Sequence, residues 1–109
     1  MRSRMLFAPL LLGTLLLSAP LAVAVAADLE TGKSLYREKC RDCHGSRGQQ
    51  RALGKSRMLN RLETDAIIAK LREVQEAGNP STPADIAKSD LSDDEIQSLG
   101  IFIQSLKRR

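Results

Sequence analysis

The sequence predicts an all-α fold with about three main helices in a single small domain. Three stretches repeat apolar residues at the spacing of one helix face, and no stretch alternates apolar and polar residues as a half-buried strand would. Two loops rich in glycine, proline or charged residues separate these stretches. The 109 residues leave room for only one domain.

Residues 1–26 have the layout of a secretory signal peptide. Arg2 and Arg4 precede an almost unbroken apolar run over residues 6–17, and small residues follow at 22–27. The apolar core is shorter than the ~20 residues needed to cross a bilayer. We therefore expect cleavage after Ala26, no membrane span after cleavage, and release of residues 27–109 into a bacterial periplasm.

Composition limits what the mature domain can be. At 83 residues (27–109), a chain buries little apolar surface and usually needs a metal, a disulfide or another cross-link. Tyr36 and Phe102 are its only aromatic residues. The formal charge of +4 falls to +2 once Arg2 and Arg4 are removed, which does not indicate binding of nucleic acid.

Charge is unevenly distributed along the chain. Residues 33–61 hold nine basic and two acidic residues, whereas residues 62–106 hold three basic and nine acidic ones. Two readings fit this pattern. Either the two halves are solvated faces of opposite sign, or they form a dipole that steers docking with an acidic redox partner.

The first helix is predicted over residues 28–39. Asp28 can cap its start, because its side chain can accept hydrogen bonds from the first turn. One side of this helix carries Leu29, Gly32, Leu35 and Tyr36 at helical spacing.

The segment after this helix carries the chemistry. Cys40-Arg41-Asp42-Cys43-His44 matches the C-x-x-C-H pattern of covalent haem attachment. Two thiols three residues apart can form thioethers with the two vinyl groups of one haem, and the next residue can then place an imidazole nitrogen on the iron. His44 is the only histidine in the chain, so it has no competitor as proximal ligand.

Other readings of this motif are weaker. A zinc site would need a fourth ligand, and the chain contains no further cysteine or histidine. A thioredoxin-like redox pair would follow a strand, whereas the preceding segment reads as a helix. A disulfide between Cys40 and Cys43 would close a very small loop and add little stability.

The second helix is predicted over residues 65–77. Thr64 is its candidate cap, and Gly78 followed by Pro80 ends it. Its buried face comprises Ile67, Ile68, Leu71 and Val74. The flanking segments 45–61 and 79–90 are predicted to be loops that wrap the haem.

The third helix has the clearest start. Ser92 and Glu95 are spaced as a capping box, and the acidic residues between them suit the positive end of the helix dipole. The apolar face that follows comprises Ile96, Leu99, Phe102, Ile103 and Leu106.

These features together resemble the class I c-type cytochromes. The resemblance is carried by residues 32–36 with 40–45, by residues 91–96 with 99–103, and in between by residues 51–60, which are similar to short bacterial periplasmic members of the c-553 type. It covers nearly all of the mature chain. It implies the class I cytochrome c fold around one covalently bound haem c, with the first and last helices crossing at Gly32 and Tyr36 packing on the Leu99 and Phe102 face.

The sequence departs from that family on the distal side of the iron. Class I members usually supply a methionine from the segment before the last helix, but here Ser81 or Thr82 takes that place. Met58 is the only methionine of the mature chain, and its thioether is a candidate distal ligand. It lies ahead of the second helix rather than after it, so we favour a role in filling the core. Further candidates are Lys55, Lys88, Asn79, a water molecule or an open site.

The main functional hypothesis is a monohaem electron carrier between periplasmic redox partners. An open distal site would instead suit a haem protein that binds a small gas, and a subunit of a larger periplasmic oxidoreductase is the third reading. We do not expect an enzyme, because no acid–base pair accompanies His44.

Overall fold

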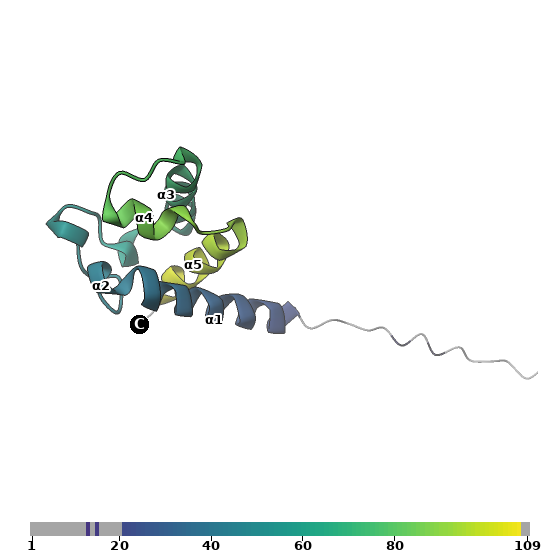
Figure 1. The fold of residues 1–109 in the computed structure, drawn as a ribbon. Helices are drawn as coiled ribbons and strands as arrows, with labels where there is room; N and C mark the ends of the chain where they lie inside the picture. The colour runs from purple at the N-terminus through teal and green to yellow at the C-terminus, as the bar shows by residue number, and fades with distance from the viewer. Residues whose placement is uncertain (1–12, 14, 16–20, 108–109) are drawn as a thin grey trace, which may run out of the picture.

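The computed structural model describes residues 13, 15 and 21–107, and the helices of this part are arranged as in Figure 1. The helices are α1 (Leu21–Lys39), α2 (Arg41–His44), α3 (Thr64–Ala77), α4 (Pro83–Ser89) and α5 (Asp93–Leu106), with two 3-10 turns, η1 (Ala52–Gly54) and η2 (Leu59–Arg61). No strand occurs among these described residues. The predicted all-α class is confirmed.

The crossing of α1 and α5 organises the domain (Figure 1). At the crossing, a Cβ atom on Gly32 would lie 2.8 Å from the Cβ of Phe102 and closer still to the backbone carbonyl of Ser98. Next to it, the rings of Tyr36 and Phe102 pack with their centroids 5.3 Å apart. The close approach at Gly32 and the packing of Tyr36, both implied by the family resemblance, are therefore present.

The core is built on the apolar face of α5. Ile96, Leu99 and Ile103 are almost completely buried there, and Tyr36 of α1 joins them. From the other side, α3 contributes Ile67, which lies in the same cluster. The predicted apolar face of α5 is buried, and that of α3 is buried except for half-buried Ile68. On α1 the prediction holds for Gly32 and Tyr36, whereas Leu29 is 36% exposed and Leu35 is half-buried.

The structure differs from the predicted start of the first helix. α1 begins at Leu21, seven residues before the expected cap at Asp28. Alanine-rich sequence explains the extension, since residues 22–27 are alanine and valine and alanine is the best helix former. The predicted cleavage point after Ala26 lies inside α1, whereas most of the predicted signal peptide lies outside the described residues.

The predicted cap of the second helix is wrong. Glu63 occupies the cap position of α3 without a side-chain hydrogen bond, and Thr64 is the first helical residue. The Thr64 hydroxyl donates instead to the side-chain oxygen of Gln104 on α5, at 2.6 Å. The predicted end is confirmed, because Gly78 follows α3 in the left-handed conformation (φ 62°).

The predicted loop over residues 79–90 contains a helix. Thr82 caps α4, and its hydroxyl accepts a hydrogen bond from the backbone N–H of Asp85 at 3.1 Å. Pro83 stands in the first turn, where its missing N–H costs nothing. The proline taken as a loop signal is therefore the start of a short helix.

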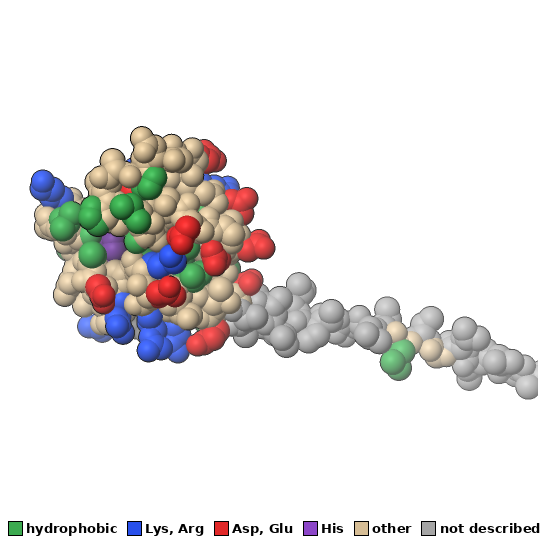
Figure 2. Space-filling model, in the orientation of Figure 1, with side chains coloured by type: hydrophobic (Ala, Val, Ile, Leu, Met, Phe, Trp, Pro, Cys, Tyr) green, Lys and Arg blue, Asp and Glu red, His purple; other side chains and the backbone are tan. Residues whose placement is uncertain are grey.

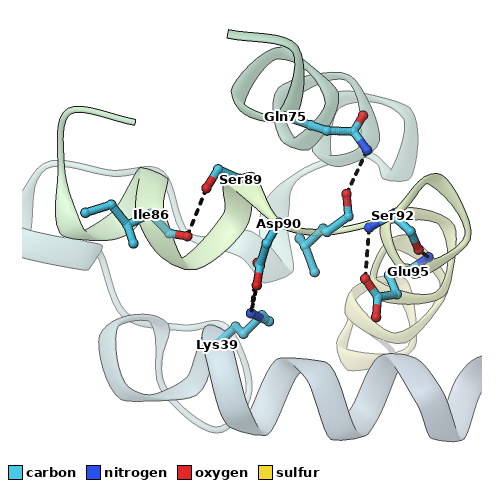
Figure 3. A network of polar contacts seen from close by, with 8 residues as sticks. Lys39, Gln75, Ile86, Ser89, Asp90, Ser92 and Glu95 are labelled. Atoms are coloured by element: carbon cyan, nitrogen blue, oxygen red, sulfur yellow. Dashed lines mark hydrogen bonds and ion pairs between the residues drawn. The ribbon is translucent and has the colours of Figure 1, made fainter. Parts of the chain in front are cut away.

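α5 starts as predicted. The backbone N–H of Glu95 donates to the Ser92 hydroxyl at 3.2 Å, and the backbone N–H of Ser92 donates to the Glu95 carboxylate at 2.8 Å (Figure 3). This reciprocal pair is the capping box.

In the part of the chain described here, no helix has the length and apolar character that crossing a membrane requires.

Candidate haem site

The C-x-x-C-H segment is a single helical turn at the end of α1. The backbone N–H of Cys40 donates to the Tyr36 carbonyl at 3.0 Å, and that of His44 donates to the Cys40 carbonyl at 2.9 Å. Residues three and four positions apart share a helix face, so Cys40, Cys43 and His44 belong to one side of this turn. No disulfide joins the two cysteines.

The two thiols have different surroundings. Cys40 is buried, whereas Cys43 is exposed. Burial raises the pKa of the Cys40 thiol to about 11, against the opposing positive charges of Lys88 and Lys39. Cys40 is therefore a neutral thiol at physiological pH, held at the edge of the core.

Tyr36 ties this turn to the core. Its phenol donates a 2.6 Å hydrogen bond to the backbone carbonyl of Gly45, the residue that follows His44. Burial raises the pKa of Tyr36 to about 12, so the phenol keeps its proton and remains a donor. Gly45 has φ 81°, which a glycine adopts without strain and which turns the chain away after the motif.

His44 presents a neutral imidazole. Its side chain is half-buried, and its Nδ1 atom is buried with no hydrogen-bond partner. Burial and then the charge of Lys88 lower the pKa of His44, while the backbone of Gln50 opposes the shift. A buried, unpaired ring nitrogen is costly unless another group satisfies the imidazole, and metal ligation uses the neutral ring.

The surface around His44 is apolar. Figure 2 shows hydrophobic side chains gathered around the histidine on one face of the molecule. Two large apolar side chains are exposed elsewhere on the described chain: Leu53 of η1 is 82% exposed, and Ile86 of α4 is 58% exposed. η1 contacts α2, which ends at His44. A flat apolar group bonded to these thiols would cover such surface, so the residues present fit a haem.

The distal candidates lie on different segments. Met58 is half-buried just before η2, Lys55 and Asn79 are exposed, and Lys88 is half-buried on α4. Ligation by Met58 thus stays a prediction.

An ion pair that the sequence did not reveal links the residue after α4 to the end of α1, next to Cys40. The Lys39 ammonium lies 3.0 Å from the Asp90 carboxylate, which directly follows α4 (Figure 3). The hydrogen bond from Lys39 lowers the pKa of Asp90 below its ordinary value. Because the partners are 51 residues apart, no local pattern could have indicated the contact.

Comparison with known proteins agrees with this geometry. Residues 27–103 match the family described as "Cytochrome C oxidase, cbb3-type, subunit III". The chain belongs to the c-type cytochromes. It is similar to a cytochrome c-553 of Helicobacter pylori strain ATCC 700392 / 26695, with 30% identity over 70 residues, which cover 64% of this chain and 73% of that protein.

A second cytochrome c-553, from Helicobacter pylori strain J99, is 31% identical over 68 residues, or 62% of this chain and 71% of the relative. No significant match to a solved structure was found. As a c-type cytochrome of this kind, the protein binds haem c covalently and is a monohaem electron carrier rather than an enzyme.

Proposed function

We propose that Cys40 and Cys43 form the two thioethers to the haem and that His44 binds its iron, in a carrier exported to the periplasm. The observation that carries this proposal is the single turn of helix that puts both thiols and the imidazole on one side, with a ring nitrogen buried and unpaired. The C-x-x-C-H spacing supports the same assignment.

Each residue of the site has a distinct task in this proposal. The bound haem supplies the one-electron redox chemistry at its iron. α2 orients the imidazole of His44, and the hydrogen bond from Tyr36 to Gly45 fixes the end of that turn. Cys40 closes the site toward the core, whereas exposed Cys43 leaves one edge open to solvent, where a redox partner can approach.

The signal-peptide layout of residues 1–26 supports processing after Ala26. In this proposal, residues 1–26 direct export and are then removed. One experiment tests both haem attachment and cleavage of the signal peptide: the full chain is expressed in a bacterial host that matures c-type cytochromes.

The purified protein should be red and should keep its colour after denaturation and acid–organic extraction. Its mass should equal residues 27–109 plus one haem. Cys40→Ala and Cys43→Ala should each weaken or abolish retention of the pigment, while Ser46→Ala, an exposed neighbour, should retain it. A colourless product, or a pigment that the solvent removes from the unaltered protein, would refute the assignment.

We also propose that the redox partner is acidic and docks on the basic half of the chain. Arg37 and Arg41 are exposed beside the site, with the Arg41 guanidinium 3.9 Å from the Asp42 carboxylate, and Lys39 is paired with Asp90. Replacing Arg37 and Arg41 by glutamate should slow association with an acidic redox protein by about tenfold at low ionic strength, and salt should remove the difference. Arg72→Glu on α3 is the matched control. Equal association rates for all variants would contradict electrostatic steering.

A chain that purifies only together with a large subunit would instead indicate a subunit of an oxidoreductase, the class of protein that the description of the matched family names.

A further inference from the structure

We propose that residues 47–61, named here the basic loop, dock the protein on a bilayer that contains anionic phospholipid. Leu53 enters the bilayer, and the basic side chains around it bind the lipid phosphates. Such docking would hold the carrier at a membrane surface without a membrane-spanning helix. The inference goes beyond electron transfer and does not depend on which residues bind the haem.

The basic loop has a high density of positive charge. Between Asp42 and Glu63 the sequence contains no acidic residue. The same interval contains five basic residues, all of them exposed: Arg47, Arg51, Lys55, Arg57 and Arg61. Five ion pairs form within the part of the chain that the structure describes, and none of them includes a residue of this loop. If both propionates of a bound haem paired with the loop, three of its five positive charges would remain.

Leu53 lies in the middle of the basic loop, and its side chain is solvated. The side chain is 82% exposed, and the backbone has φ 54°, in the left-handed region. Among the described residues, Leu53 is the only residue other than glycine with a positive φ. A left-handed backbone is unfavourable for leucine, and a solvated apolar side chain does not stabilise the fold. Folding stability therefore does not explain a leucine at this position, whereas entry into an apolar phase does.

Hydrogen bonds fix the conformation of the basic loop next to the haem motif. Within the loop, the backbone N–H of Ala52 donates to the Ser56 hydroxyl at 2.7 Å. At its base, the backbone N–H of Gln50 donates to the His44 carbonyl at 2.9 Å. Over η1, the leftmost turn in Figure 1, Figure 2 shows a basic side chain beside apolar ones. The exposed side chains thus project from an ordered turn.

This combination of side chains fits a lipid surface better than a protein partner. Aromatic residues supply much of the binding energy of protein interfaces, but residues 43–62 contain none. At a bilayer, basic side chains bind the headgroups while an apolar neighbour is buried at the boundary with the acyl chains. Leu53 lies within four positions of Arg51, Lys55 and Arg57, which is the arrangement that this mode of binding requires.

The test measures co-sedimentation of the haem-loaded mature protein with vesicles. The unaltered protein should bind vesicles of phosphatidylglycerol and phosphatidylcholine at low ionic strength, should not bind vesicles of phosphatidylcholine alone, and should be released by salt. Replacing Arg51, Lys55 and Arg57 together by glutamine should weaken binding on the order of a hundredfold, because each basic residue near an anionic bilayer strengthens binding about fivefold. Leu53→Asn should weaken binding about tenfold, because asparagine tolerates the left-handed backbone but does not enter the bilayer.

A second triple variant separates the basic loop from the net charge of the protein. Lys33 of α1 and Lys70 and Arg72 of α3 are exposed, so replacing these three by glutamine removes the same charge from other surfaces. This variant should lose no more than about fivefold in vesicle binding. Equal losses in the two triple variants would overturn the proposal, because binding would then follow net charge alone.

Three further results would also contradict docking on lipid. These are equal binding to neutral and anionic vesicles, full binding by Leu53→Asn, and no binding of the unaltered protein to anionic vesicles at low ionic strength. In the last case, retention of the unaltered protein but not the loop variant on immobilised polyglutamate would assign the loop to an acidic protein partner. Binding is scored from the protein in the pellet, so a colourless product, which would refute the haem site, is detected separately.

Discussion

Replacing Gly32 by valine should lower the free energy of unfolding by about 3 kcal/mol or more. The Cβ atom of the new side chain would overlap the backbone carbonyl of Ser98 and lie 2.8 Å from the Cβ of Phe102. Because both neighbours belong to α5, the two helices would have to move apart, and the core residues between them would lose contact. Denaturant unfolding of the haem-loaded protein, followed by circular dichroism, measures the loss.

Ser34→Val is the control for this substitution. Ser34 is exposed on α1, so valine there changes helix propensity without meeting α5, and we expect a loss of no more than about 0.7 kcal/mol. Equal unfolding free energies for the two variants would show that α1 and α5 do not approach closely at Gly32.

Tyr36→Ala should cost about 3 to 5 kcal/mol, the range for removing a large buried aromatic side chain. Tyr36 is 1% exposed, packs on Phe102 and donates to the carbonyl of Gly45. Tyr36→Phe keeps the ring and removes only the hydroxyl, so it should cost about 1 to 3 kcal/mol, because the Gly45 carbonyl loses its buried donor.

The two variants separate packing from hydrogen bonding. The same denaturant titrations measure the free energy of unfolding of both variants. If the turn that Tyr36 holds through Gly45 affects the iron, the Tyr36→Phe protein should also have a shifted reduction potential. If Tyr36→Phe were as stable as the unaltered protein and had the same potential, the hydrogen bond to Gly45 would have no part in holding the haem motif.

Local patterns predicted much of this fold. The capping box of Ser92 and Glu95 and the left-handed stop at Gly78 depend on residues a few positions apart, and both occur where expected. The apolar faces of α3 and α5 were also correct, because helical spacing specifies which side is buried.

The structural features that the sequence did not predict depend on contacts between distant segments. Thr64 was expected to cap α3, but the nearby Gln104 of α5 takes its hydroxyl. α4 was taken for a loop because a short helix beginning at proline leaves a weak periodic signal. Its attachment through Lys39 and Asp90 joins residues 51 positions apart, which single-sequence reasoning does not detect.

The residues of the candidate site also fall into two groups: those indicated by a local sequence pattern and those that depend on contacts with a distant segment. The proposed attachment residues lie within residues 40–44, so their spacing alone identified Cys40, Cys43 and His44. A distal ligand must come from another segment, and its choice requires knowing which side chain of that segment points inward. This is why the sequence left Met58, Lys88 and others open as distal candidates.

The pairing of α1 with α5 has a consequence for the order of folding. These helices stand at opposite ends of the domain sequence, yet they contact each other more extensively than any other pair of described elements. Because the chain is synthesised from its N-terminus, α1 has no partner helix until α5 has been synthesised. Such long-range closure slows folding. It also leaves Cys40 accessible to a haem-attaching apparatus before the core closes over that residue.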